Sequence, residues 1–215
     1  MFSYSKRCPL HCPATYLCAV MENIAYGTLA QIIAGRRTTK AAAMNGQKIK
    51  DETIDQLLHL ADWAPTHGRT EPWRFFVYTG EALEQFCAQH AQLYWDNTPE
   101  EGRNPTTFEN LKHMGDKVSH LVVAVMQRGA NPKIPVLEEI AATSAAIQNI
   151  LLGATALDIA TIWNTGGMAL KPAMKAHFSL GEEDQVMGFI YMGYTDDQVK
   201  EGKRNIPAAD KIKWM

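Results

Sequence analysis

Between Ile140 and Leu157 the sequence carries a helical pattern that is apolar on almost every face. The positions of the pattern recur at helical spacing with alanines between them: Ile140, Thr143, Ile147, Ile150, Leu151, Ala154 and Leu157, with Ala141, Ala142, Ala145 and Ala146 interspersed. A helix without a polar face has to be buried against other elements or against another subunit. The rest of the chain must therefore build a layered core around this segment.

Four other segments have the composition of buried strands. They are rich in aromatic and β-branched residues, and they cover Trp73–Thr79, His120–Met126, Ile159–Trp163 and Val186–Tyr191. They alternate with helical patterns and show no internal repeat. This order predicts a layered α/β or α+β domain in which helices cover a central sheet.

The remaining helical patterns are shorter and more amphipathic. The second of them begins with Asp51 as N-cap and stops at Ala64, because a residue that precedes proline disfavours the α region. Besides the long apolar helix, helices are therefore expected at residues 24–35, 51–64, 83–90, 108–111 and from Pro172 onward.

The composition is that of an ordinary globular protein, with 46% hydrophobic and 20% charged residues and a net charge of −2 over 215 residues. This length suits one domain, which we expect over residues 21–215. No basic surplus points to a nucleic-acid partner. No stretch approaches the roughly 18 apolar residues of a membrane helix. Cytoplasm is the default compartment, since nothing looks like a disulfide framework.

Residues 1–20 contain three of the four cysteines. Prolines and a histidine interrupt the segment, which therefore lacks the apolar stretch of a signal peptide. Cys8, His11, Cys12 and Cys18 could ligate a metal. Zinc sites, however, normally combine two closely spaced pairs across a fold, and no second pair exists here. We therefore favour a disordered extension ahead of the domain and expect no metal.

Arg36, Arg37 and Thr38 close the first helical pattern and are the first candidates for a binding site. Two guanidinium groups and a hydroxyl can hold a phosphate, because arginine binds it bidentately and keeps its charge. Arginine near a helix C-terminus also complements the helix dipole, which is the simpler explanation when the motif is taken alone.

His67 lies in a loop that leads into a strand, which is a common place for a ligand contact in an open sheet. A surface histidine is the alternative. Arg69 in the same loop could offer a cation to a bound anion, or it could be solvated. Both residues are candidates only in combination with other motifs.

The segment Asn164–Gly167 directly follows a strand. Paired glycines let the backbone approach a ligand and direct its N–H groups outward, although a simple turn between a strand and a helix has the same composition. Trp63, Trp73 and Trp163 are core residues by default. Flat apolar surfaces of this kind would also suit a flavin pocket.

Several catalytic and nucleotide-binding motifs are missing from the sequence. There is no GxGxxG after a first strand, no GxxxxGK[ST], no GxSxG and no HExxH. No Ser/His/Asp or Cys/His set stands out by spacing. This composition fits an enzyme whose cofactor carries the difficult chemistry while the protein positions it.

Four segments taken together resemble the FMN-dependent nitroreductase family, in its short single-domain branch. They are IIAGRRTTKAA after the first helix, ADWAPTHGRTEPWRFFVYTG in the middle, IATIWNTGGM later on and QVMGFIYMGY before the tail. Their order and spacing agree from about Asn23 to Tyr194, which is most of the chain.

The resemblance implies an α+β fold with a central mixed sheet surrounded by helices. It implies an interlocked homodimer with FMN at the interface, and the long apolar helix would then be dimer core. The implied activity passes a hydride from NAD(P)H via the flavin to a small-molecule acceptor, such as a nitro compound or a quinone, in a ping-pong cycle. FMN would carry the chemistry, so no side chain is expected to be catalytic.

The resemblance also implies the cofactor-binding residues. Arg36, Arg37 and Thr38 would hold the phosphate and ribityl side of FMN. Further contacts would come from Trp63 and His67 near the ring or ribityl chain, from Trp163, Asn164 and Thr165 against the ring, and from Lys203 and Arg204 at the phosphate. Trp63 and His67 could reach the site from either subunit.

Two departures from the family pattern leave the acceptor open. Glu71 stands where the family often has Gln, and Arg69 where it often has Asn or Ser. A carboxylate cannot donate a hydrogen bond to a flavin carbonyl unless it is protonated. The alternatives are a specialised flavin enzyme of the same fold, acting in dehalogenation, flavin fragmentation or dehydrogenation, and a non-catalytic flavin-binding protein.

Overall fold

The computed structural model describes residues 13–198 and 200–215, with side chains from residue 24 onward. These residues fall into two compact units, the first ending at Arg36 and the second running from Arg37 to Met215. The first unit contains α1 (Pro13–Gly35), which includes the helix expected at 24–35 and begins earlier. Of the candidate metal ligands, Cys8, His11 and Cys12 lie outside the described residues, as does the side chain of Cys18. A domain limit at residue 21 stays a prediction.

The second unit is built on a four-stranded sheet of β1 (Trp73–Thr79), β2 (His120–Met126), β3 (Ala160–Asn164) and β4 (Gln185–Gly193). The strand order is β1-β2-β4-β3, and each of the three pairings is antiparallel. The α+β class is confirmed, but the expected mixed pairing is not present among these strands. A parallel neighbour would have to come from a strand beyond these four.

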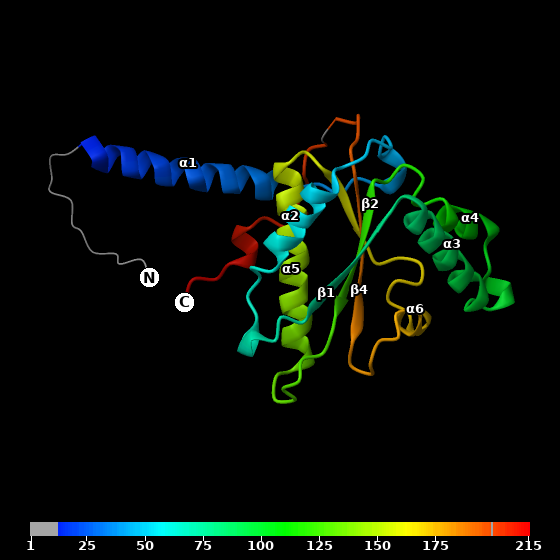
Figure 1. The fold of residues 1–215 in the computed structure, drawn as a ribbon. Coiled ribbons are helices and arrows are strands. Elements are labelled where there is room, and N and C mark those ends of the chain that lie inside the picture. Colours follow the sequence, from blue (N-terminus) through cyan, green and yellow to red (C-terminus); the bar gives the residue numbers. More distant parts are fainter. Residues whose placement is uncertain (1–12, 199) are drawn as a thin grey trace. The chain divides into compact units, whose positions relative to one another are not determined.

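Helices cover both faces of this sheet, as Figure 1 shows. One face carries α2 (Asp51–Ala61) and α5 (Val136–Ala156), and the other carries α3 (Gly80–Asp96) and α6 (Pro172–His177). The short helix α4 (Pro105–Lys112) packs against α3. No helix in the described part of the chain combines the length and apolarity needed to cross a membrane.

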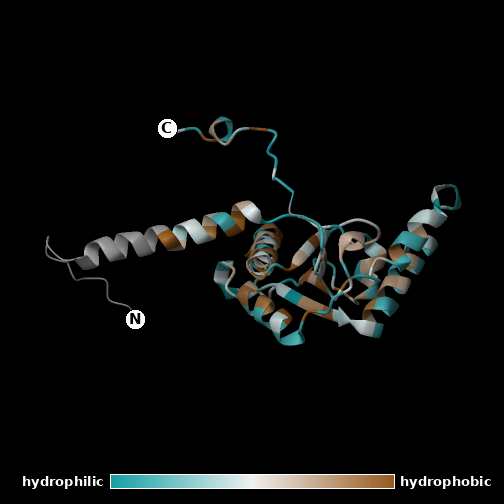
Figure 2. Ribbon diagram, turned by 90° about the horizontal axis from the view of Figure 1, so that it is seen from above, coloured by the Kyte–Doolittle hydropathy of each residue, from teal (hydrophilic) through white to brown (hydrophobic). Residues whose placement is uncertain are grey.

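The long apolar helix α5 is buried against the sheet and α2, as its sequence predicts. Ala146, Ile147, Ile150 and Ala154 are fully buried, and Figure 2 shows hydrophobic colouring along much of α5. Gly153 permits a close helix contact, because a Cβ atom there would lie 2.6 Å from Leu60 Cδ1. The helix thus packs without a polar face because it has partners on more than one side.

Two helix boundaries differ from the sequence prediction. Lys50 is the N-cap of α2, and Asp51 begins the first turn. The helix ends at Ala61, with a turn between it and Pro65. By contrast, Asn104 forms a true N-cap for α4, since its side chain accepts hydrogen bonds from Thr106 N at 2.9 Å and Thr107 N at 3.2 Å.

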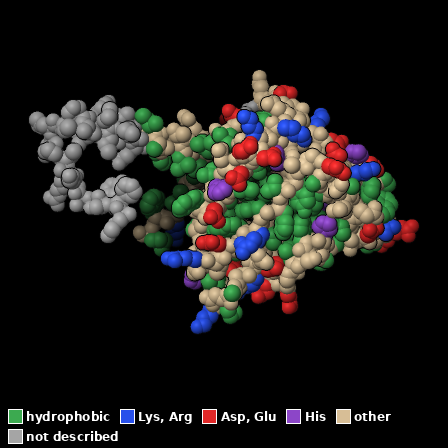
Figure 3. Space-filling model, in the orientation of Figure 1, with side chains coloured by type: hydrophobic (Ala, Val, Ile, Leu, Met, Phe, Trp, Pro, Cys, Tyr) green, Lys and Arg blue, Asp and Glu red, His purple; other side chains and the backbone are tan. Residues whose placement is uncertain are grey.

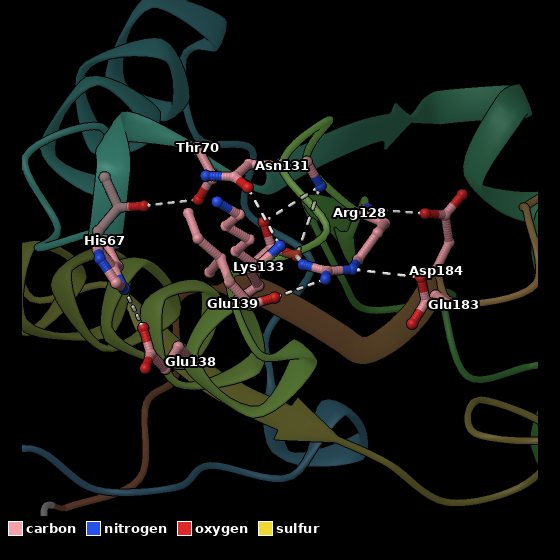
Figure 4. Close-up of polar contacts among 12 residues, drawn as sticks. His67, Thr70, Arg128, Asn131, Lys133, Glu138, Glu139, Glu183 and Asp184 are labelled. Atoms are coloured by element: carbon pink, nitrogen blue, oxygen red, sulfur yellow. Dashed lines mark hydrogen bonds and ion pairs between the residues drawn. The ribbon is translucent and has the colours of Figure 1, made fainter.

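A buried ionic network ties the end of β2 to the start of α5 (Figure 4). Arg128 Nη1 donates to Glu139 Oε2 at 2.5 Å, and its Nη2 donates to the Ile134 carbonyl at 2.5 Å. Gly129 N donates to Glu139 Oε1 at 3.1 Å, while Arg128 Nε reaches Glu183 Oε2 at 3.3 Å. Glu139 is 1% exposed. A carboxylate this deep is tolerated because it is paired with Arg128 and both of its oxygens accept hydrogen bonds.

Candidate functional site

The segment after the Arg36-Arg37-Thr38 motif lies beside the start of β3 and the C-terminal end of β4. Thr39 N donates to the Thr161 carbonyl at 2.9 Å, and Asn45 N donates to the Tyr194 carbonyl at 2.8 Å. Thr195 Oγ1 donates to the Ala43 carbonyl at 2.7 Å. These bonds fix residues 39–45 against the start of β3 and the residues that follow β4.

A cavity of about 620 Å³ lies between this segment, the sheet and the C-terminal end of α4. Its sheet side includes Ile162, Asn164 and Tyr191, and Lys40 and Ala41 come from the segment. This volume is within the range of small-molecule and cofactor sites. Of the residues named in advance, Asn164 lines this cavity.

Tyr191 gives the cavity an unsatisfied polar group. The residue is fully buried, and its hydroxyl has no hydrogen-bond partner in the described structure. Burial raises the pKa of Tyr191, with a smaller contribution from Cys87, so the hydroxyl stays protonated. A buried hydroxyl without a partner calls for an explanation, and a ligand with an acceptor oxygen is one.

The α4 wall of the cavity is charged. His113 lies between two carboxylates, with its Nδ1 3.1 Å from Asp116 Oδ2 and its Nε2 3.4 Å from Glu109 Oε2. Asn110 and Lys117 line the same wall. This side can therefore offer both donors and acceptors to a bound molecule.

Two backbone amides of the turn after β3 donate hydrogen bonds to side chains. Gly166 N donates to Asn164 Oδ1 at 2.8 Å, and Met168 N donates to His90 Nε2 at 3.0 Å. The amides of Thr165 and Gly167 lie in the same turn, on either side of Gly166. These two N–H groups are the donors that the turn can offer to a ligand.

Arg37 and the C-terminal tail lie together. Arg37 Nε donates to the Lys200 carbonyl at 2.8 Å, and a Cβ atom on Gly202 would lie 2.5 Å from Arg37 Nη2. Arg204, predicted as a second cation, follows directly and is exposed, with Nη1 bonded to the Lys203 carbonyl at 2.9 Å. The structure thus places the tail beside Arg37. Arg36 closes the first unit, and Thr38 is exposed.

The loop between α2 and β1 has a strained backbone, and its candidate residue His67 contacts α5 rather than the cavity. His67 Nδ1 lies 2.5 Å from Glu138 Oε2 at the start of α5, as Figure 4 shows. Arg69 and Glu71 have φ angles of 55° and 43°, in the left-handed region that non-glycine residues rarely adopt. Such strain often accompanies functional loops, but His67 does not line the cavity of its own chain.

The three candidate tryptophans have different environments. Trp73 is buried at 5% exposure, as expected for a core residue, whereas Trp63 is 85% exposed, so the default core assignment is wrong for Trp63. Trp163 is half-buried, and its Nε1 donates to the Met187 carbonyl at 2.9 Å. Its ring packs against Gly188, on the face of the sheet opposite to Tyr191. Neither Trp63 nor Trp163 lines the cavity.

Sequence reasoning missed several cavity residues. Lys40 lies only two positions after Thr38, and this proximity was the available signal. Asn110 and His113 are three residues apart, which places them on one face at the end of α4. Tyr191 and Phe189 share a face because side chains alternate along a strand, but nothing in the sequence shows that the Tyr191 hydroxyl lacks a partner.

Comparisons with known proteins identify the family and the fold of this chain. The family model described as "Nitroreductase family" matches residues 33–194. The Bacillus subtilis (strain 168) protein YfhC, provisionally named an NAD(P)H nitroreductase, is 27% identical over 195 residues, covering 88% of this chain and 95% of that protein. The solved structure of a nitroreductase-like family protein from Bacillus cereus has a TM-score of 0.75 at 25% identity, covering 87% and 95% of the two chains.

The fold recurs at lower identity. The structure described as the FMN-dependent nitroreductase NfnB from Mycobacterium smegmatis in complex with NADPH has a TM-score of 0.65 at 16% identity. It covers 88% of this chain and 99% of that one. At this identity the likeness concerns the fold alone.

Proposed function

Because the chain belongs to the nitroreductase family, we propose that it is a cytoplasmic FMN-dependent oxidoreductase that acts as a homodimer. It takes a hydride from NAD(P)H and delivers it to a nitro compound, a quinone or a similar acceptor. The observation that carries this proposal is the cavity that Asn164, at the end of β3, lines together with Lys40 and with Tyr191, whose buried hydroxyl has no partner in the described structure.

The residues present fit FMN. A flavin ring has carbonyl oxygens and ring nitrogens along one edge, and it needs hydrogen-bond donors there. The turn that follows Asn164 would offer the amides of Thr165 and Gly167, and the buried hydroxyl of Tyr191 in the cavity lining is a further donor. The phosphate needs cations, which Arg37 and the adjoining tail can supply. Support for FMN and NAD(P)H also comes from the names of the relatives.

FMN, when bound, supplies the hydride transfer between the nicotinamide and the acceptor. The protein supplies orientation and charge. Lys40 lines the cavity and favours negative charge on a ligand there, and the turn amides that follow Asn164 would add to this effect, since fixed donors near a developing anion need no rearrangement. Asn110 and His113 face the same cavity and can contact the second ligand. No side chain is needed as a catalytic acid or base.

A direct test of the proposal is a visible spectrum of the purified protein, followed by anaerobic NADH addition. We expect bound FMN and rapid bleaching of its visible absorbance, then recovery when a nitroaromatic is added. Retained flavin without nitroaromatic turnover would favour a specialised flavin enzyme of the same fold. Flavin that NADH does not bleach would favour a non-catalytic binding protein. A colourless protein that does not take up FMN in a titration contradicts the proposal itself.

We predict that Arg37→Ala weakens FMN binding by about 1.5–3 kcal/mol, the value of a hydrogen bond to a charged group. The change removes a guanidinium beside the tail and leaves the cavity intact. Isothermal titration with FMN measures it. Arg103→Ala is the matched control, since Arg103 also donates to backbone carbonyls, at 3.0 Å, but lies beside Trp95. Equal FMN affinity in Arg37→Ala and Arg103→Ala would contradict the phosphate role.

Homodimerisation is supported by apolar side chains left at the surface. Trp63 is 85% exposed and Leu137 is 74% exposed, both on the α2 and α5 side of the sheet. The edge strand β1 adds Val77 on the same side, at 44% exposure. Figure 3 shows hydrophobic side chains in the middle of one face, among charges of both signs. Exposed apolar groups of this size favour an interface with a second subunit.

We predict that Trp63→Lys shifts the protein toward monomer, since a buried tryptophan at an interface contributes about 2 kcal/mol or more. Analytical ultracentrifugation over a concentration series measures the dissociation constant, which we expect to rise by about 30-fold or more. Leu170→Lys is the control, because Leu170 is also exposed, at 58%, but precedes α6 on the other face of the sheet. A dissociation constant that Leu170→Lys raises as much as Trp63→Lys does would place the interface elsewhere.

A further inference from the structure

His90 on α3 is a buried histidine that accepts a hydrogen bond from the turn after β3. Its side chain is 1% exposed, and its Nε2 accepts a hydrogen bond from Met168 N at 3.0 Å. Because Nε2 accepts, the neutral ring carries its proton on Nδ1. Nδ1 is buried and has no partner among the described residues. The one hydrogen bond of the ring among the described residues is therefore the bond to the turn that follows β3.

The turn approaches the ring as closely as a glycine allows. Gly167 has a φ angle of 62°, and a Cβ atom there would lie 2.6 Å from His90 Nε2. A side chain at Gly167 would also meet Leu111 Cδ2 at 3.1 Å. Both the backbone conformation and the contact thus require glycine, and they press the turn against His90.

The hydrogen bonds at the turn decide which amides a ligand can use. Asn164 Oδ1 accepts a hydrogen bond from the Gly166 amide, and His90 Nε2 accepts one from the Met168 amide. The amides of Thr165 and Gly167 lie on either side of the Gly166 amide, next to Asn164, which lines the cavity. We propose that His90 is a positioning residue, whose neutral ring holds the turn so that these two amides face the cofactor. This inference rests on the proposed FMN function.

The surroundings of His90 keep its ring neutral. Burial, and next the nearby His177 of α6, lower the pKa of His90 to about 4. The other neighbours are the rings of Phe86 and Phe189, at centroid distances of 6.3 Å and 5.1 Å. With no carboxylate pairing to the ring among the described contacts, Nε2 remains an acceptor at neutral pH, as the bond to Met168 requires.

Three full-length variants test the positioning role. His90→Leu removes the acceptor, and His90→Gln keeps a side-chain carbonyl that can accept from Met168. Leu83→Ala is the control, because Leu83 is buried at 2% exposure on the same helix, about two turns earlier, and has no polar atom to accept from the Met168 amide. Each protein is measured in two ways: hydrogen exchange of the Met168 amide without FMN, and the dissociation constant and midpoint potential of bound FMN.

We expect His90→Leu to speed Met168 exchange, to raise the FMN dissociation constant about tenfold and to shift the midpoint potential. His90→Gln should recover most of both effects. Leu83→Ala should lower the melting temperature while leaving FMN affinity and potential near wild type. If His90→Leu does not fold, His90→Asn replaces it, because the shorter side chain cannot reach the Met168 amide.

The inference is overturned if Met168 exchange in His90→Leu equals that of wild type, because the ring then does not hold the turn. It is also overturned if exchange accelerates while FMN affinity and potential stay unchanged, or if Leu83→Ala shifts them equally. Failure of the proposed function looks different. Wild-type protein then binds no FMN, whereas Met168 exchange still reports whether His90 holds the turn.

Discussion

Replacing Glu139 with alanine will lower the free energy of unfolding by about 3–5 kcal/mol, the usual cost of removing one partner from a buried ion pair. Glu139 is 1% exposed and accepts hydrogen bonds from Arg128 Nη1 and from Gly129 N. The change leaves the Arg128 guanidinium without its carboxylate and frees the Gly129 amide. Urea denaturation followed by circular dichroism measures the loss, which should appear as a lower midpoint at an unchanged slope.

Glu138 provides a matched control in the adjacent position of α5. Its carboxylate pairs with His67 at 2.5 Å, but its side chain is 46% exposed. An exposed pair is screened by solvent, so Glu138→Ala should cost less than about 1 kcal/mol. If the two alanine variants have the same stability, burial of the Arg128–Glu139 pair is not what makes it important.

The sequence was sufficient for the four strands because their signal is local. Aromatic and β-branched runs marked β1 and β2 to the residue, and β3 and β4 to within one or two positions. The apolar pattern of α5 likewise predicted its burial. Strand order and direction depend on contacts far apart in the sequence, and no local pattern reports them. The antiparallel pairing of all four strands was therefore not predicted.

The candidate site was predictable where a motif is contiguous, and less so where it depends on which face a side chain occupies. Asn164, the first residue of the predicted turn, lines the cavity, and a glycine pair after a strand is a local signal. Trp163 was named with its neighbour Asn164, yet strand alternation directs it to the opposite face, against Gly188. Composition cannot distinguish these two faces.

The Arg128–Glu139 network and His90 escaped prediction for a related reason. Arg128 follows a strand and Glu139 begins a helix, so each looks like an ordinary surface charge in sequence. His90 occupies an apolar position of a helix, where a buried histidine looks like a core residue. Only the folded chain brings the Met168 amide to its ring at 3.0 Å.

Acidification will destabilise the protein through His90 more strongly than through an exposed histidine. The pKa of the His90 ring is lowered from 6.5 to about 4, first by burial and second by His177. Well above pH 6.5 the ring is neutral in both the folded and the unfolded chain. As the pH falls toward 4, the unfolded chain takes up a proton that the folded chain excludes, so stability decreases. The contribution lost between pH 7 and pH 4 is about 3 kcal/mol.

His90→Gln isolates this effect, because glutamine does not titrate but can still accept from Met168. The measurement is the free energy of unfolding of both proteins at several pH values between 7 and 4. We expect the wild-type curve to fall more steeply than the variant curve, by about 3 kcal/mol over the range. Parallel curves would mean that the folded protein admits the proton on His90. Such a ring could not stay an acceptor for the Met168 amide in acid, and the turn beside the cavity would then loosen before the protein unfolds.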